Sequence, residues 1–227
     1  MSPPGHTLRG LIWGGLGLVL TFVVAAGTWN LLQGTSERQA AGGRPGAGAL
    51  EGPGDFGAVD PFILVERSGR TITREDLSGS WWIADFIFTR CTGVCPLLTT
   101  RMASLGRTLA ELPAGRDVRL VSFTVDPDWD TPEVLDAYAR QATAGGADTG
   151  RWLFLTGPHD VMYRLIGESF HLNVAERGDE PAAEGELITH SDRFVLVDPE
   201  GRIRGYYHGT DEDSVERLVQ DLESLRR

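Results

Sequence analysis

Lysine is absent from this chain of 227 residues, and cysteine occurs only twice. All 21 basic residues are therefore arginine, a bias that we attribute to genomic base composition and not to a function. Acidic residues number 32, and the net charge of −11 argues against nucleic acid as a partner. The sequence contains no internal repeat. Its composition suits one folded domain with short appendages and excludes a disordered or collagen-like chain.

Charged side chains are also missing between Arg9 and Glu37. Within that gap, residues 11–32 are dominated by Leu, Ile, Val, Ala, Gly and Trp, and a bilayer span takes about 20 residues. We expect an uncleaved transmembrane anchor at 11–32, after a short N-terminal tail at 1–10. A cleaved signal peptide ending at the small residues 25–27 is the alternative. No cysteine lies near this segment, which excludes a lipid-modified N-terminal cysteine.

A change of composition follows the apolar run. Residues 33–55 are rich in Gly, Ala, Pro and Ser without periodicity and predict a flexible linker, with the folded domain at 56–227. An N-terminal anchor followed by one acidic domain usually exports that domain. We therefore expect the domain on the periplasmic or another extracytoplasmic side of the membrane. A cysteine pair can persist there as a disulfide.

Strand and helix patterns alternate along the domain, with the polar, acidic stretch at 174–189 predicted to be a surface excursion. Apolar runs bounded by turn residues predict strands, and apolar residues at helical spacing behind capping residues predict helices. This order indicates an α/β fold, a sheet with helices on both faces. The predicted strands lie at 62–66, 71–73, 81–88, 118–125, 152–155, 194–197 and 202–207, and the predicted helices at 96–112, 130–143, 160–169 and 214–225.

The two cysteines, Cys91 and Cys95, follow the apolar strand at 81–88 and open the next helix. Free backbone N–H groups and the partial positive charge of a helix N-terminus stabilise a thiolate, so we expect both thiols to be exposed and more acidic than free cysteine. Such thiolates transfer electrons or hold a soft metal ion; a structural disulfide or plain packing is the alternative. In a regular helix, Cβ atoms four residues apart are about 5–6 Å from each other, too far for a relaxed disulfide. Cys91 is therefore expected in the loop before the helix.

The order of strand, cysteine pair, helix, final hairpin and final helix is that of the thioredoxin fold. Over residues 56–227 the chain resembles the Sco/SenC family of membrane-anchored, thioredoxin-like copper proteins. The resemblance implies a thioredoxin-like fold with an N-terminal hairpin and an insertion before the last hairpin. Four segments carry it: FIFTRCTGVCP at 86–96, VSFTVDPDWDTP at 121–132, WLFLTG at 152–157 and HSDRFVLVD at 190–198.

In that family, two thiolates and one distant histidine bind a single copper ion, and the protein helps to build the dinuclear CuA site of cytochrome c oxidase. By motif, the matching positions are Cys91, Cys95 and His190. Two soft thiolates and one imidazole form a low-coordinate set that suits Cu(I), whereas a structural zinc site needs four ligands. The resemblance implies a copper-binding metallochaperone. Its partner would be the oxidase subunit that carries CuA or another copper-accepting protein. The chain departs from the common pattern at Thr189 and at 92–93, where many members have an acidic residue and Pro-Asp; this bears on partner recognition and leaves the ligands intact.

Asp85 lies inside an apolar strand, six residues before Cys91. Burial would raise the pKa of its carboxyl group and suit it as a proton acceptor for thiol–disulfide exchange, and its position is similar to that of the buried aspartate of thioredoxin. The alternative is a strand-edge residue paired with Arg90 or Arg101. The rival function is therefore a thiol–disulfide oxidoreductase that uses Cys91 and Cys95 as a redox pair to reduce the cysteines of a copper-accepting partner. A peroxidase of the peroxiredoxin class fits these residues less well.

Two further carboxylates, Asp126 and Asp130, follow the strand at 118–125. We expect them to be a turn residue and a helix cap. The alternative is that they dock a partner or form hydrogen bonds that orient the metal ligands.

Overall fold

A strand with no polar residue except Asp85, β3 (Trp82–Ile87), lies near the middle of a seven-stranded mixed sheet in the computed structural model. All of its residues are buried, as expected for a strand that is covered on both faces. It pairs in parallel with β4 (Arg119–Thr124), which pairs in parallel with β5 (Trp152–Thr156).

The structure describes residues 52–144, 150–172 and 191–227. The predicted anchor, nearly all of the predicted linker, the predicted surface excursion and His190 lie outside these ranges. Within them, no helix has the length and apolar character needed to cross a bilayer.

Antiparallel hairpins complete the sheet on both sides. β1 (Ile63–Glu66) and β2 (Thr71–Thr73) form the first hairpin, and β1 pairs with β5. β6 (Arg193–Val197) and β7 (Ile203–His208) form the second, and β6 pairs with β3. The strand order is β2-β1-β5-β4-β3-β6-β7.

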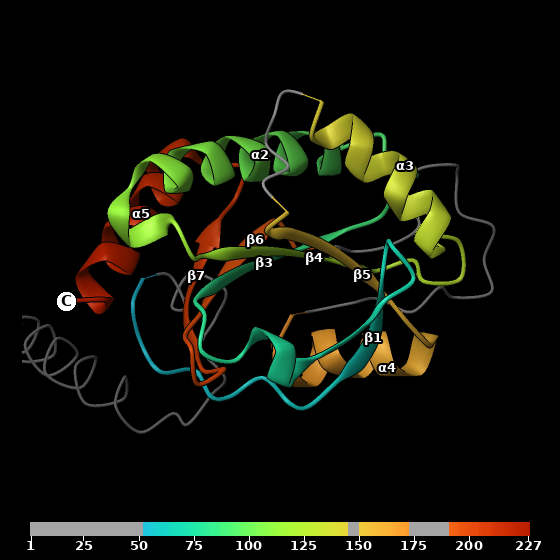
Figure 1. Ribbon diagram of the computed structural model, residues 1–227, viewed down its shortest axis with the longest axis horizontal. Coiled ribbons are helices and arrows are strands. Elements are labelled where there is room, and N and C mark those ends of the chain that lie inside the picture. The colour runs from blue at the N-terminus through green and yellow to red at the C-terminus, as the bar shows by residue number, and fades with distance from the viewer. Residues whose placement is uncertain (1–51, 145–149, 173–190) are drawn as a thin grey trace, which may run out of the picture. The chain divides into compact units, whose positions relative to one another are not determined.

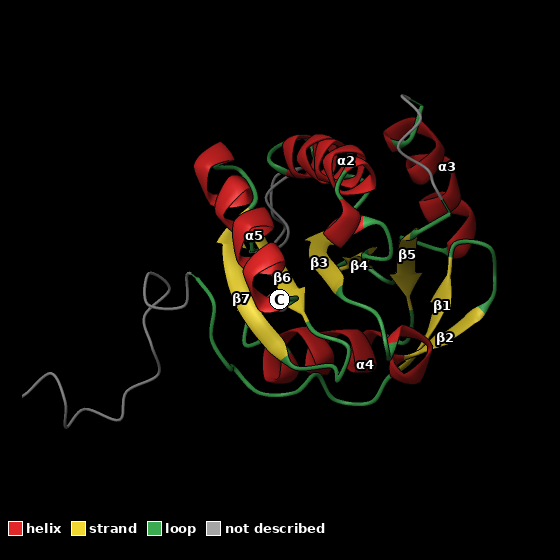
Figure 2. Cartoon of the chain, turned by 60° about the vertical axis from the view of Figure 1, so that its left-hand side comes forward, coloured by secondary structure: helices red, strands yellow, loops and turns green. Residues whose placement is uncertain are grey.

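Helices cover both faces of the sheet, which confirms the predicted α/β architecture (Figures 1 and 2). One face carries α2 (Cys95–Glu111), α3 (Pro132–Ala142) and α5 (Glu212–Leu225). The other carries α4 (His159–Arg164), which continues into a π-helical turn at Leu165–Ser169. Every strand and helix predicted within the described residues is present, with ends shifted by small amounts.

Two short 3₁₀ helices connect the larger elements, Arg74–Leu77 after β2 and Pro113–Gly115 after α2. The first is fixed by a capping box. The Asp76 backbone N–H donates to the Thr73 hydroxyl oxygen (3.4 Å), and the Thr73 N–H donates to the Asp76 carboxylate (2.8 Å).

The alternation of β3 side chains decides what lies beneath the cysteines. Trp82 and Phe86 point to the α4 face, where their rings lie 6.1 and 5.1 Å from the ring of Phe170. Successive side chains of a strand point to opposite faces, so Asp85 points to the face covered by α2 and α3.

Three parallel strands, β3, β4 and β5, end at the same edge of the sheet, which we call the cysteine end because Cys91 follows β3 there. β6 is antiparallel to β3, and β7 is antiparallel to β6. The N-terminus of β6 and the C-terminus of β7 therefore also lie at the cysteine end.

Residues 54–59 run along the outer edge of β7 at the opposite end of the sheet, and we call them the N-terminal clasp. The Gly54 N–H donates to the Arg204 carbonyl (2.7 Å), and the Val59 N–H donates to the Gly201 carbonyl (2.9 Å). These bonds pair part of a strand edge that would otherwise be free.

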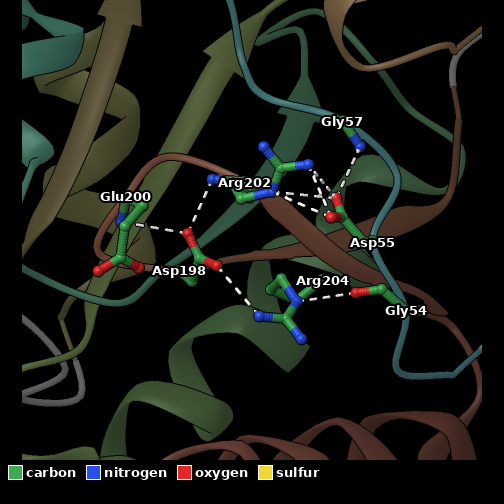
Figure 3. A network of polar contacts seen from close by, with 7 residues as sticks. All are labelled: Gly54, Asp55, Gly57, Asp198, Glu200, Arg202 and Arg204. Atoms are coloured by element: carbon green, nitrogen blue, oxygen red, sulfur yellow. Dashed lines mark hydrogen bonds and ion pairs between the residues drawn. The ribbon is translucent and has the colours of Figure 1, made fainter.

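Side chains of β7 and of the preceding turn reinforce the clasp (Figure 3). Arg202 faces the Asp55 carboxylate, with Nη2 2.7 Å from both oxygens, and the Arg204 Nε donates to the Gly54 carbonyl (2.8 Å). Asp198 lies between the two arginines: its carboxylate accepts hydrogen bonds from the Arg202 backbone N–H (2.8 Å) and from Arg204 Nη1 (3.2 Å).

Candidate functional site

The cysteines lie at the junction of β3 and α2. Cys95 is the first residue of α2, with Pro96 at the next position. Cys91 lies in the preceding loop, where its N–H donates to the Phe88 carbonyl (3.2 Å). This confirms the predicted loop position. Both cysteines are free thiols, and their side chains are close enough to form a hydrogen bond with each other.

Burial distinguishes the two thiols. Cys91 is 8% exposed, whereas Cys95 is completely buried. Loss of hydration raises the pKa of the Cys95 thiol far above its ordinary value, and the neighbouring Cys91 adds to the shift. The predicted exposure is therefore wrong for both cysteines, and the predicted acidity is wrong for Cys95, because burial outweighs the stabilisation of its thiolate by the helix terminus.

Asp85 lies beneath the cysteines and is fully buried. Neither carboxylate oxygen has a hydrogen-bond partner among the described residues. Burial raises the pKa of Asp85 to about 7. The side chain of Ser122, its cross-strand partner on β4, favours the charged carboxylate and so opposes part of this rise. Burial also raises the pKa of Cys95 and of Tyr138 on α3, and the Asp85 charge contributes to both shifts. The Asp85 charge therefore opposes ionisation of both the Cys95 thiol and the Tyr138 phenol.

The alternative interpretation of Asp85 as a strand-edge residue is wrong. Its strand is internal to the sheet, and the two arginines that would have paired with it are engaged elsewhere. Arg90 Nη2 lies 2.5 Å from Asp126 Oδ2, and Arg101 Nη1 lies 3.1 Å from Glu212 Oε2.

Asp130 connects the loop after β4 to the loop that carries Cys91. Its buried carboxylate accepts hydrogen bonds from the Thr89 hydroxyl (2.5 Å), the Thr89 N–H (3.2 Å) and the Thr124 hydroxyl (2.5 Å). Burial raises the pKa of Asp130, although these hydrogen bonds oppose the shift. The N-cap of α3 is Thr131, whose hydroxyl accepts a bond from the Val134 N–H (3.4 Å), so the prediction of Asp130 as a helix cap is wrong.

Asp126 is a turn residue, as predicted. Its carbonyl accepts hydrogen bonds from the N–H groups of Trp129 (3.1 Å) and Asp130 (2.9 Å). Its carboxylate binds Arg90, and the Arg90 guanidinium lies 4.5 Å from the centroid of the Trp129 ring. The residue before Cys91 is thus held between a carboxylate and an indole.

Three of these residues, Thr89, Thr124 and Trp129, were not predicted from the sequence, and Arg90 was expected beside Asp85 instead of Asp126. The available signal was that polar residues follow both β3 and β4, which predicts that they meet if the two strands are parallel neighbours. The register that brings Asp130 to Thr89 is not visible in the spacing of residues.

His190 lies outside the described residues, so the three-residue ligand set that the resemblance implies stays a prediction. Ser191 and Asp192 directly precede β6, at the cysteine end of the sheet. Asp192 Oδ2 lies 2.9 Å from His208 Nδ1 and accepts a hydrogen bond from the Thr210 hydroxyl (3.0 Å). Among the residues that the structure describes, no three His, Cys, Asp or Glu side chains come together in a group suited to a metal ion.

Comparison with known proteins agrees with this architecture. The SCO1/SenC family model matches residues 52–227. The SCO1 protein homolog of Bacillus subtilis (strain 168) is 32% identical over 167 residues, which cover 73% of this chain and 81% of that protein. The structure of BsSco, a member of the Sco family of cytochrome c oxidase assembly proteins in which a disulfide switch was identified, has a TM-score of 0.62 and 30% identity and covers 77% of this chain and 96% of its own.

A more distant structure shares the fold. ScoI of Arabidopsis thaliana, solved with copper bound, has a TM-score of 0.60 and 24% identity, and the match covers 75% of this chain and 99% of that chain. The family match over the whole described domain, together with the cysteine pair at the junction of β3 and α2, identifies the chain as a member of the SCO1/SenC family.

Proposed function

We propose that this chain is a membrane-anchored copper chaperone with its domain on the periplasmic or another extracytoplasmic side. It binds one copper ion as cargo through Cys91, Cys95 and His190. It passes the ion to the subunit of cytochrome c oxidase that carries the CuA site, or to another copper-accepting protein. The observation that carries the proposal is the pair of adjacent free thiols at the junction of β3 and α2.

The donor chemistry supports this cargo. Thiolate sulfurs are soft ligands that favour Cu(I), and one imidazole completes a low-coordinate site. The raised pKa of Cys95 means that copper must displace a proton from its thiol, so binding weakens as the pH falls. Support for His190 as the third ligand comes from its neighbours Ser191 and Asp192, which lie at the cysteine end of the sheet.

Copper titration tests the proposal. The full chain, in detergent micelles and reduced under anaerobic conditions, is titrated with Cu(I) in competition with the chelator bicinchoninate. We expect one copper per chain, at least tenfold weaker binding in Cys91→Ser and in Cys95→Ser, and weaker binding in His190→Ala. The control is His159→Ala, which removes an imidazole on the opposite face of the sheet at the start of α4. Affinity unchanged by both Cys91→Ser and His190→Ala would refute the proposal.

A second function is favoured by one observation, the buried and unpaired carboxyl of Asp85 beneath the thiols. In this function the chain reduces the disulfide of a copper-accepting partner. The thiolate of Cys91, the more exposed cysteine, attacks one partner sulfur, and the other partner sulfur leaves as a thiolate. Cys95 then gives its proton to the Asp85 carboxylate and attacks Cys91, which releases the second partner thiolate. The chain ends with a Cys91–Cys95 disulfide, and the partner ends with two reduced cysteines.

Exchange with a small disulfide tests this second function. Asp85→Asn should slow the exchange at pH 8 and remove a rise in rate near pH 7, because the amide cannot accept the Cys95 proton. Asp160→Asn, an exposed carboxylate on α4, serves as the control. A reduction potential below about −300 mV together with no exchange would count against this function.

A further inference from the structure

An exposed aromatic side chain lies beside the loop that carries Cys91. In the described part of the chain, three large hydrophobic side chains are exposed: Ile63 (69%), Leu97 (44%) and Trp129 (51%). Leu97 is in the first turn of α2, two residues after Cys95. Trp129 follows β4 at the cysteine end of the sheet and contacts Arg90, the residue before Cys91. We call Asp128 and Trp129 the thiol rim.

The indole of the thiol rim is held in place. The backbone N–H of Trp129 donates to the Asp126 carbonyl, and the Asp126 carboxylate holds Arg90 against one side of the indole ring. Asp130, the next residue, is bound to Thr89 through its buried carboxylate. A large aromatic surface that is already ordered loses little conformational freedom when a partner covers it, and Trp and Arg dominate the energetic centres of protein interfaces.

The charges of the thiol rim indicate the chemistry of the partner. Arg90 is neutralised by Asp126, whereas no ion pair engages Asp128 or Glu133 within the described residues. Both of these carboxylates are exposed, on the same loop as Trp129 and on the first turn of α3. The uncompensated charge beside the indole is therefore negative and complements a basic segment. An arginine or lysine would also be attracted to the open part of the indole ring.

A partner that reacts with the thiols must also contact the protein surface around them. Cys91 is only 8% exposed, so a sulfur of a partner protein must approach closely to reach it. We propose that the thiol rim is the docking surface for a basic, cysteine-bearing segment of the partner protein. The proposal rests on the proposed function, namely that Cys91 and Cys95 exchange copper or electrons with cysteines of a partner.

A first experiment measures docking without copper. The reduced full chain in detergent reacts with a synthetic disulfide peptide flanked by arginines, with a matched peptide flanked by glutamates, and with oxidised glutathione. Each peptide disulfide is reduced to two thiols while Cys91 and Cys95 form a disulfide. Trp129→Ala should slow the reaction with the arginine peptide by about tenfold and leave the glutathione reaction unchanged. Ile63→Ala, an exposed apolar control on β1, should change neither rate; in strand order, β5 and β4 separate β1 from β3.

Charge reversal gives a result that misfolding cannot imitate. Asp128→Arg should shift the preference of the chain from the arginine peptide toward the glutamate peptide, and added salt should reduce the preference of both proteins. The proposal is overturned if Trp129→Ala reacts with the arginine peptide at the wild-type rate. It is also overturned if Trp129→Ala slows the peptide and glutathione reactions equally, or if Asp128→Arg keeps the wild-type preference.

Copper transfer separates this proposal from the proposed function. The Cu(I)-loaded chain is mixed with the reduced arginine peptide or with bicinchoninate. Trp129→Ala should slow only the transfer to the peptide. A chain that binds no copper refutes the chaperone function, and the disulfide reactions still decide the role of the thiol rim.

Discussion

The Asp130 carboxylate accepts hydrogen bonds from both the hydroxyl and the backbone N–H of Thr89, two residues before Cys91. A side chain from the loop after β4 thus fixes the backbone that leads to the first cysteine. Since Asp130 is fully buried, the bonds are shielded from water, and their loss leaves buried donors without partners. The position of Cys91 therefore depends on a carboxylate 39 residues later in the sequence.

Replacing Asp130 by alanine should destabilise the domain. The change leaves the Thr89 N–H and the O–H donors of Thr89 and Thr124 without their acceptor, and we expect a loss of about 2–4 kcal/mol in the free energy of unfolding. Urea denaturation measures the loss. Asp130→Asn keeps one acceptor oxygen and should cost less. The control Asp128→Asn, an exposed carboxylate of the same loop, should stay within about 0.5 kcal/mol of wild type, and an equal loss in this control would contradict the role of Asp130.

Asp85 should make stability fall as the pH rises from about 4 to 7. Its pKa is raised from 3.8 to about 7 in the folded domain, so between these values the folded state holds a proton that the unfolded state has lost. The free energy of unfolding therefore decreases with rising pH and levels off above pH 7, a loss on the order of 4 kcal/mol.

Denaturation curves at several pH values test this dependence. Asp85→Asn removes the titrating group, so the difference in stability between the variant and wild type should grow from pH 4 to 7 in favour of the variant. A constant difference over that range would show that Asp85 does not carry the effect.

Alkylation should distinguish the two cysteines. Cys91 keeps 8% of its surface exposed, whereas Cys95 is completely buried and its thiol has a raised pKa. Since the thiolate is the reactive form, limited treatment of the reduced chain with iodoacetamide at pH 8 should modify Cys91 first. Peptide mapping by mass spectrometry reads the order, with Cys91→Ser as the control that leaves only Cys95. Faster modification of Cys95 would contradict the structure.

The N-terminal clasp should open without loss of the thiol site. Arg202→Ala removes the paired contact with Asp55, and we expect faster hydrogen exchange of the amides in residues 54–59. Exchange of the amides in α2 should be unchanged, because α2 begins at the cysteine end of the sheet, whereas the clasp lies at the other end. Arg140→Ala, which removes an exposed ion pair on α3, serves as the control. Equal exchange of residues 54–59 in both variants would rule out this role of Arg202.

The sequence predicted the fold better than it predicted the chemistry of the site. The strands and helices have strong apolar periods, so β3, β4 and the helix α2 between them were predictable. The environment of the thiols was not. The helix terminus acts on the thiols locally, whereas the raised pKa of Cys95 comes from its burial in the packed domain, which no spacing of residues reveals.

The carboxylates illustrate the same limit. Burial of Asp85 was one of two interpretations of its place in an apolar strand, and the structure confirms that burial. Asp130 was predicted to be a helix cap because it precedes Thr131 and Pro132. Its role depends on the parallel pairing of β3 with β4, a contact between distant segments that one sequence does not specify.

The N-terminal clasp also determines on which side of the domain an attachment through the N-terminus lies. It pairs with the residues just before and at the start of β7, which lie level with the start of β3, while Cys91 lies beyond the end of β3. The six residues of β3 span roughly 20 Å between these two points. A surface, a label or a fused protein attached ahead of residue 52 is therefore joined to the domain on the far side from the thiols. An immobilised domain would still present Cys91 to molecules in solution.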